Sequence, residues 1–169
     1  GTDQPGEDPR DHVAFIVDED VCTRCALCVD RCPTGVIILG KLDPNVVDGD
    51  PHVRTVPVYL PPSYDASPGR RYPVTFVLTG FTGRGRMLLN DGPWSPALDD
   101  RMNGLIASGA CGEMILVMPD CYTRFGGSQY INSSATGRYE DHLIDELVPW
   151  IDSRYRTLAA REHRGVMGK

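Results

Sequence analysis

Apolar positions divide the chain into two stretches separated by a polar segment. In the first stretch, apolar runs at residues 13–17 and 36–39 have the length of β-strands. Residues 26–31, between these runs, favour a short helix. Residues 1–11 are polar and interrupted by two prolines, which predicts a flexible lead.

The second stretch alternates apolar runs with amphipathic segments. Its apolar runs lie at residues 53–60, 72–78, 114–118 and 164–167. They have the length of strands, and the continuous run at residues 72–78 is typical of a strand in a parallel sheet that is covered on both faces. Residues 119–137 lack such a pattern and are predicted to form a long loop. Strands that alternate with helices predict an α/β fold with a parallel sheet.

Two segments of the second stretch have helical periodicity. We expect the first helix to take Ser95 as its N-cap and Pro96 as its first residue, and to end at Gly109. The second repeats its apolar residues every four positions from Tyr139, and Pro149 should kink or end it. The expected apolar face of the first helix consists of Leu98, Met102, Leu105 and Ile106.

A segment rich in Asp, Pro and Gly joins the two stretches. We therefore predict one domain at residues 1–41, a linker at 42–52 and a second domain at 53–169. The residues leave open whether this junction is a natural fusion or an accident of gene assembly.

Negative charge is concentrated before the junction. Residues 1–50 contain 4 basic and 11 acidic residues, a net charge of −7 in a chain whose total is −6. Such an acidic module can be steered towards a partner with a basic surface; alternatively, the acidic residues near the start only keep the chain in solution. No basic stripe with aromatic residues suggests nucleic-acid binding. No apolar run reaches the roughly 20 residues of a membrane span.

Four cysteines carry the strongest chemical signal. Cys22, Cys25, Cys28 and Cys32, followed directly by Pro33, form the C-x2-C-x2-C-x3-C-P run of bacterial iron–sulfur proteins. Zinc is the second interpretation, but zinc sites usually separate two pairs of ligands by about a dozen residues or more. We predict that the four thiolates bind a [4Fe–4S] cluster. Because they must stay reduced, we expect a cytoplasmic protein.

The predicted strand, cysteine loop, helix and strand at residues 12–41 resemble one half of a bacterial two-cluster ferredoxin. In those ferredoxins, the fourth thiolate of each run binds the other cluster, whereas this chain has a single run. The fourth ligand is therefore left open between Cys32, a partner chain and a segment before Gly1. Cys111 or Cys121 is a further alternative, although a lone cysteine is usually a small buried hydrophobe.

The second stretch resembles the putative-esterase branch of the α/β-hydrolases, which includes esterase D, enterobactin-esterase-like enzymes and mycolyltransferases. The matching segments are VPVYLPPSYD, RRYPVTFVLTGF, MILVMPD, YINSSATGRYEDHLIDELVPWIDSRYRT and HRGVMGK. The resemblance implies an incomplete α/β-hydrolase parallel sheet, preceded by the small ferredoxin-like α+β segment. It also implies hydrolysis of a small-molecule carboxylic ester by a serine in the complete protein.

The same resemblance locates an oxyanion hole. Where the family has Leu-His-Gly-aromatic after a strand, this chain has Leu78-Thr79-Gly80-Phe81, with Thr79 in place of His. The oxyanion needs backbone N–H donors, and a glycine lets the substrate approach closely. Gly80 and Phe81 are therefore the candidate oxyanion-hole residues.

The resemblance also makes Gly168 the first residue of the G-x-S-x-G nucleophile elbow. The serine would then follow Lys169, and the acid and histidine of the triad would follow the serine. We therefore assign no catalytic residue within this chain and expect residues 1–169 alone to be inactive. The alternative is an electron-transfer protein with a non-catalytic, hydrolase-like docking domain. The histidines and hydroxyls expected only to pack, cap or face solvent are His142, His163, Ser133, Ser134 and Thr136.

Overall fold

The structure is a computed structural model that describes residues 36–39, 50, 54–90, 92 and 94–168. The predicted cysteine loop, and the strand and helix predicted on either side of it, lie outside the described residues.

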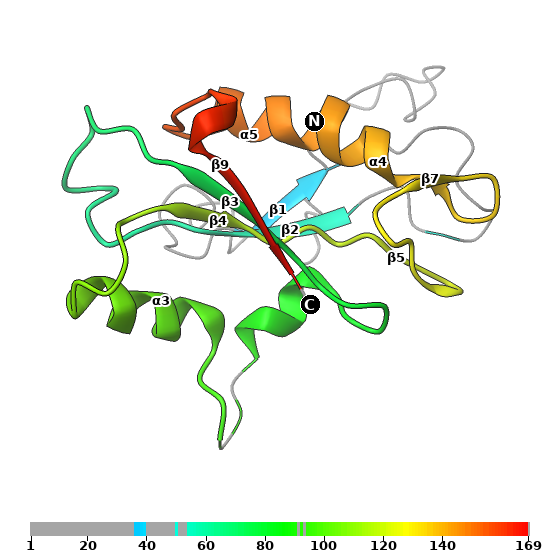
Figure 1. Cartoon of the computed structure of the whole chain (residues 1–169), viewed down its shortest axis with the longest axis horizontal. Coiled ribbons are helices and arrows are strands. Elements are labelled where there is room, and N and C mark those ends of the chain that lie inside the picture. Colours follow the sequence, from blue (N-terminus) through cyan, green and yellow to red (C-terminus); the bar gives the residue numbers. More distant parts are fainter. Residues whose placement is uncertain (1–35, 40–49, 51–53, 91, 93, 169) are drawn as a thin grey trace, which may run out of the picture.

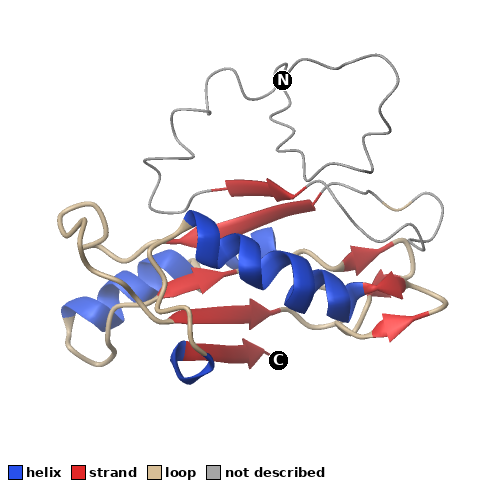
Figure 2. Ribbon diagram, turned by 90° about the horizontal axis from the view of Figure 1, so that it is seen from above, coloured by secondary structure: helices blue, strands red, loops and turns tan. Residues whose placement is uncertain are grey.

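Five strands form one mixed sheet in the order β1-β2-β4-β3-β9 (Figures 1 and 2). They are β1 (Val36–Leu39), β2 (Arg54–Tyr59), β3 (Val74–Leu78), β4 (Ile115–Val117) and β9 (Arg164–Gly168). Each coincides with a predicted strand to within two residues. Figure 2 shows β9 at one margin of the sheet, next to β3.

The sequence predicted a parallel sheet, but the sheet is mixed. β3 is parallel to both β4 and β9, whereas β2 is antiparallel to β4 and to β1. The connections explain the difference. The chain between β2 and β3 contains turns but no helix, and it re-enters the sheet at the end where β2 left it, so β3 runs opposite to β2. A crossover through helix α3 (Leu98–Ala107) joins β3 to β4, which lets these two strands run in parallel.

Helices cover both faces of the sheet (Figure 1). The 3-10 helix η2 (Gly85–Leu89) and α3 lie on one face. A continuous helical segment lies on the other, formed by α4 (Tyr139–Asp141), the π-helical η3 (His142–Leu147) and α5 (Val148–Arg154). Within the described part of the chain, no helix is both long and apolar enough to cross a membrane.

Alternate strand residues supply the two cores. The larger core packs Val74 and Ile115 of the sheet against Leu147 and Ile151 of the helical segment. The smaller core lies on the other face, where Leu116 and its neighbours pack against Met102 of α3. Burying an aliphatic side chain of this size contributes about 1.5–3 kcal/mol, so these cores fix the position of the strand ends.

Helix α3 begins later than the sequence predicts and ends as predicted. Its N-cap is Ala97 rather than Ser95, because Ser95 instead exchanges backbone hydrogen bonds of 3.2 and 3.3 Å with Gly92. Gly109 follows the helix with φ +73°. It donates a 3.0 Å hydrogen bond to the carbonyl of Ile106, in the left-handed cap that favours glycine.

One detail of the predicted helices is wrong, and one of the two outcomes predicted at Pro149, a helix end, does not occur. Leu105, assigned to the buried face of α3, is 39% exposed, whereas Met102 is buried. Pro149 does not end the second helix, which continues to Arg154. Proline lacks an N–H and clashes with the carbonyl four residues before it. The helix accommodates it with the wider π-helical turn η3, in which Val148 donates to Leu143, five residues back.

The predicted loop at 119–137 contains two small hairpins. One pairs β5 (Tyr122–Thr123) with β6 (Gly126–Gly127), and the other pairs β7 (Asn132–Ser133) with β8 (Gly137–Arg138). Two-residue strands are too short to produce an alternating pattern in the sequence.

The predicted linker and first domain both contact the second domain. β1 pairs along its whole length with β2, from Val36 opposite Pro57 to Leu39 opposite Arg54. Asp50, inside the predicted linker, is 4% exposed and accepts the backbone N–H of Arg124 at 2.7 Å.

Candidate functional site

The carboxyl ends of three parallel strands meet at one edge of the sheet. Leu78, the last residue of β3, pairs with Gly168, the last residue of β9. A Cβ at position 168 would lie 3.0 Å from the carbonyl oxygen of Leu78, so a glycine permits this close approach. Open α/β sheets bind their ligands at such an edge.

A small hollow lies at this edge. It is lined by Thr79, Gly80, Phe81, Gly83, Cys121, Gly127, Gln129 and Tyr130. It contains about 210 Å³ of empty space, part of it open to solvent. The chain that follows β3 therefore forms part of the wall of a hollow at this edge.

The candidate oxyanion residues both line this hollow. Their carbonyl groups are engaged: Gly80 accepts from the N–H of Gly83 at 2.8 Å, and Phe81 accepts from the N–H of Gly127 at 2.7 Å. Their own backbone N–H groups donate no hydrogen bond to any other described residue. An oxyanion hole requires backbone N–H groups that are free to donate to the substrate oxygen, and these two have no other partner among the described residues. Their role in catalysis stays a prediction.

The β5–β6 hairpin holds Phe81 in place. A Cβ at Gly126, whose φ is +109°, would lie 2.4 Å from Cζ of Phe81. A Cβ at Gly127 would lie 2.9 Å from the carbonyl oxygen of Phe81. Only glycines leave room for the phenylalanine here, and no pattern in the sequence indicates that the hairpin packs against the oxyanion turn.

Tyr130 contacts the same turn from the other side of the hollow. Its hydroxyl accepts the backbone N–H of Thr79 at 2.8 Å and lies 3.1 Å from the Thr79 carbonyl oxygen. Burial raises the pKa of Tyr130. The Thr79 N–H is thus engaged, which leaves Gly80 and Phe81 as the donors available to a ligand.

A buried arginine supports the wall that contains Cys121. Arg54 of β2 is 2% exposed, donates to the carbonyl of Tyr122, and donates to the Tyr139 hydroxyl at 2.7 Å. Burial raises the pKa of Tyr139 to about 12, against the opposing effect of Arg54. The role of Arg54 could not be predicted from the sequence, because its partners lie 68 and 85 residues away in the chain.

Cys121 lines the hollow as a neutral thiol. Burial raises its pKa to about 12, although nearby Arg54 acts in the opposite direction. It is therefore a small buried hydrophobe rather than a nucleophile. Cys111 is half-buried. In the part of the chain that the structure describes, no three His, Cys, Asp or Glu residues are grouped to hold a metal. The predicted cluster ligands lie outside that part: Cys22, Cys25, Cys28 and Cys32.

His142 and His163 do not line the hollow. His142 is buried in η3, where its Nδ1 lies 2.7 Å from Oε2 of Glu146. His163 is exposed, just before β9. The hydroxyls of Ser133, Ser134 and Thr136 belong to the β7–β8 hairpin region and do not line the hollow either.

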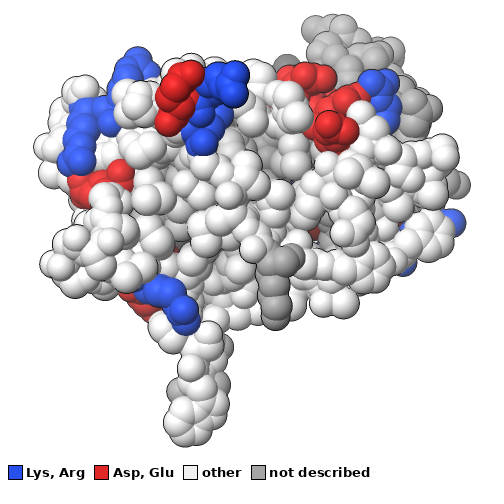
Figure 3. All heavy atoms as spheres, viewed as in Figure 1, with Lys and Arg blue, Asp and Glu red and all other residues white. Residues whose placement is uncertain are grey.

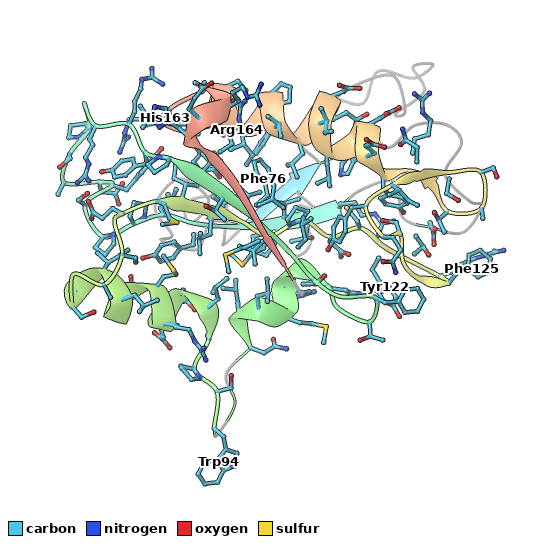
Figure 4. All side chains as sticks on the ribbon, in the orientation of Figure 1. Phe76, Trp94, Tyr122, Phe125, His163 and Arg164 are labelled. Carbon is cyan, nitrogen blue, oxygen red and sulfur yellow. The ribbon has the colours of Figure 1, made fainter. Side chains whose placement is uncertain are left out.

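The surface around this edge is largely uncharged on the face that Figure 3 shows, where charged side chains gather over the helical segment 139–154. Tyr122 and Phe125 lie on the same side as the oxyanion turn (Figure 4). The guanidinium of Arg84 stacks 4.5 Å from the ring centroid of Tyr122. The aromatic residues that line the hollow itself are Phe81 and Tyr130.

Comparisons with known proteins agree with this geometry. Residues 15–38 match the 4Fe-4S binding domain. Among solved structures, the chain is similar to a ferulic acid esterase, with 28% identity over 69% of this chain and 44% of that one, and a TM-score of 0.57. A CE1 ferulic acid esterase from Anaeromyces mucronatus is 24% identical over 73% of this chain and 45% of its own, with a TM-score of 0.52.

An S-formylglutathione hydrolase from Agrobacterium tumefaciens has the same fold, with 17% identity over 80% of this chain and 48% of its own, and a TM-score of 0.52. The chain spans less than half the length of each of these three structures. Their shared architecture is that of the esterase α/β-hydrolases. Residues 51–169, most of the chain, match the family model described as Putative esterase, and the chain belongs to that family.

Proposed function

We propose that this chain supplies the oxyanion side of a serine carboxylic-ester hydrolase. The observation that supports this most directly is the pairing of Leu78 with Gly168. Gly168 would open the nucleophile elbow, and the residues after it leave the sheet at the same edge as the turn after Leu78. A serine two positions after Gly168 would therefore emerge close to the N–H groups of Gly80 and Phe81.

The proposed reaction proceeds through an acyl-serine. The serine oxygen attacks the ester carbonyl, the alcohol leaves, and water then releases the acid. The N–H groups of Gly80 and Phe81 would stabilise the negative charge on the tetrahedral intermediates; one such donor is typically worth about 10²–10³ in rate. In this family order, the serine, the acid and the histidine follow one another. All three would come after Lys169, so residues 1–169 alone would not hydrolyse an ester.

An ester of an aromatic acid is the first substrate class to test. One structural relative is a ferulic acid esterase, and two aromatic side chains, Phe81 and Tyr130, line the hollow. Aromatic rings of a substrate pack favourably on such side chains.

Two forms of the protein test the proposal: residues 1–169, and a chain that continues through the elbow serine. Both are assayed with p-nitrophenyl acetate and methyl ferulate, and both are treated with a fluorophosphonate. We expect turnover and labelling only in the longer chain, with the label two residues after Gly168. Replacing that serine by alanine is the matched control. Turnover by residues 1–169 above a heat-denatured sample would contradict the proposal.

We further propose that Cys22, Cys25, Cys28 and Cys32 hold a [4Fe–4S] cluster. The support is a donor set of four thiolates in the spacing that such clusters use, and the family match at residues 15–38. The cluster would supply one-electron transfer. The acidic residues around it favour a redox partner with a basic surface, and the reduced thiolates favour a cytoplasmic setting.

With such a cluster, the alternative function is electron transfer, in a protein whose hydrolase-like part only docks a partner. Anaerobic reconstitution should give a broad charge-transfer absorbance and about four irons per chain. Cys25→Ser should lose both signals, whereas Cys111→Ser, the matched control, should keep them. Bound zinc without colour would contradict the cluster. An intact cluster together with an inactive longer chain would favour the docking function.

A further inference from the structure

Tyr130 is held in an uncommon backbone conformation beside the hollow. Its φ is +57°, and that of the preceding Gln129 is +60°. Residues other than glycine rarely adopt this left-handed region. Two in succession persist only where the surroundings hold them, and such positions gather at functional sites.

The consequence of this conformation is a contact with the oxyanion turn. The Tyr130 hydroxyl lies 2.8 Å from the backbone nitrogen of Thr79, 3.1 Å from its carbonyl oxygen and 3.0 Å from its Oγ1. A phenol has one proton to donate and can accept from others. It therefore accepts the Thr79 N–H and donates its own proton within the same residue. Burial raises the pKa of Tyr130, which keeps that proton on the hydroxyl.

The turn is thus held at both ends. Tyr130 holds Thr79 at the start, and the Gly127 N–H holds the carbonyl of Phe81 at 2.7 Å at the end. Between these two contacts, the N–H groups of Gly80 and Phe81 have no partner among the described residues. The two anchors engage the other polar groups of the turn, and the two candidate donors belong to residues that line the hollow.

We propose that Tyr130 is a positioning residue for the oxyanion hole, and that its hydroxyl acts through Thr79 to orient the Gly80 and Phe81 N–H groups. The inference rests on the proposed esterase function. Thr79 stands where the family usually has His, and its small side chain brings Oγ1 within reach of the tyrosine hydroxyl. A displacement of about 1 Å in such a site can cost on the order of a hundredfold in rate.

A purely structural role for Tyr130 is the rival interpretation, since its ring also packs near Cys121 and Tyr139. Tyr130→Phe separates the two roles because it keeps the ring and removes the hydroxyl. Tyr59→Phe is the matched control: it also removes one hydroxyl hydrogen bond, of 2.8 Å to Asn103, but on the α3 side of the sheet.

The first test uses residues 1–169 and needs no activity. Amide hydrogen exchange at Thr79, measured by NMR, should be at least about tenfold faster in Tyr130→Phe and unchanged in Tyr59→Phe. The Gly80 and Phe81 amide resonances should also move in Tyr130→Phe. Thr79→Val, which keeps the backbone contacts, should retain most of the protection. Unchanged Thr79 exchange in a folded Tyr130→Phe variant would overturn the proposal.

The second test uses the longer chain with its nucleophile. Tyr130→Phe should lower kcat about ten- to a hundredfold while KM stays within about twofold, because the contact acts on the transition state. Tyr59→Phe should leave both values unchanged. If the wild-type longer chain hydrolyses the ester and Tyr130→Phe has the same kcat, only the positioning role is refuted. A wild-type longer chain without turnover would refute the proposed function and, with it, this role, even if Thr79 exchange behaves as expected.

Discussion

The substitution Gly85→Ala should destabilise the protein strongly, because the backbone just after β4 occupies the space that the alanine methyl group would need. Gly85 is buried at the start of η2. A Cβ there would lie 2.1 Å from the carbonyl oxygen of Met118, 2.7 Å from its carbonyl carbon and 2.9 Å from the carbonyl oxygen of Pro119. Main-chain atoms cannot rotate away as a side chain can. Overpacking usually costs about 1–3 kcal/mol, and we expect about 3 kcal/mol here.

Gly104→Ala makes the same chemical change with the opposite expected sign. Gly104 lies inside α3, and nothing lies within 4 Å of its added Cβ. Alanine should stabilise the helix by about 0.5–1 kcal/mol, because glycine loses more backbone entropy on folding. The pair therefore separates the effect of the contact from that of the methyl group itself.

Urea unfolding followed by far-UV circular dichroism measures both variants. With a slope of about 2 kcal/mol per M, the midpoint should fall by about 1.5 M in Gly85→Ala and rise by about 0.4 M in Gly104→Ala. A midpoint for Gly85→Ala within about 0.3 M of the wild type, at an unchanged slope, would refute the close approach of η2 to the end of β4. It would also weaken the position assigned to the oxyanion turn, which leads directly into η2.

Two further predictions concern ionisable groups. Because burial raises the pKa of Cys121 to about 12, iodoacetamide at about pH 8 should modify it only after unfolding, and peptide mass spectrometry should find half-buried Cys111 modified first; equal rates would contradict the burial. The Ser63 hydroxyl, the Ser63 N–H and Arg70 lower the pKa of Glu113, so its contribution to stability is present above the unfolded pKa and is lost as pH falls through the folded pKa. Glu113→Gln should therefore show a smaller loss of unfolding free energy between about pH 5 and pH 3, and an unchanged loss would argue against these contacts.

The elements predicted from the sequence are those whose signal is local. The strand ending at Leu78 is a continuous apolar run, and the cap at Gly109 depends only on neighbouring backbone. The start of α3 was misplaced because Ser95 bonds to Gly92 rather than capping the helix. Of the kink or helix end predicted at Pro149, the end does not occur, because a π-helical turn accommodates the proline.

In the candidate site, too, only the residues with a local signal could be predicted. Gly80 and Phe81 could be proposed because their motif is contiguous and resembles a known family. Tyr130 could not, since its contact with Thr79 joins residues 51 positions apart. Such contacts depend on where the sheet brings loops together, which no periodicity in the chain records.

The pairing of β1 with β2 joins the segments that match two different family models into one sheet. β1 starts within the iron–sulfur match, and β2 lies within the esterase match. Excising residues 1–41 to obtain a minimal hydrolase would strip the outer strand and bare the main-chain N–H and C=O groups of β2, inviting another molecule to add its own strand. A clean dissection would need a replacement strand or a redesigned margin.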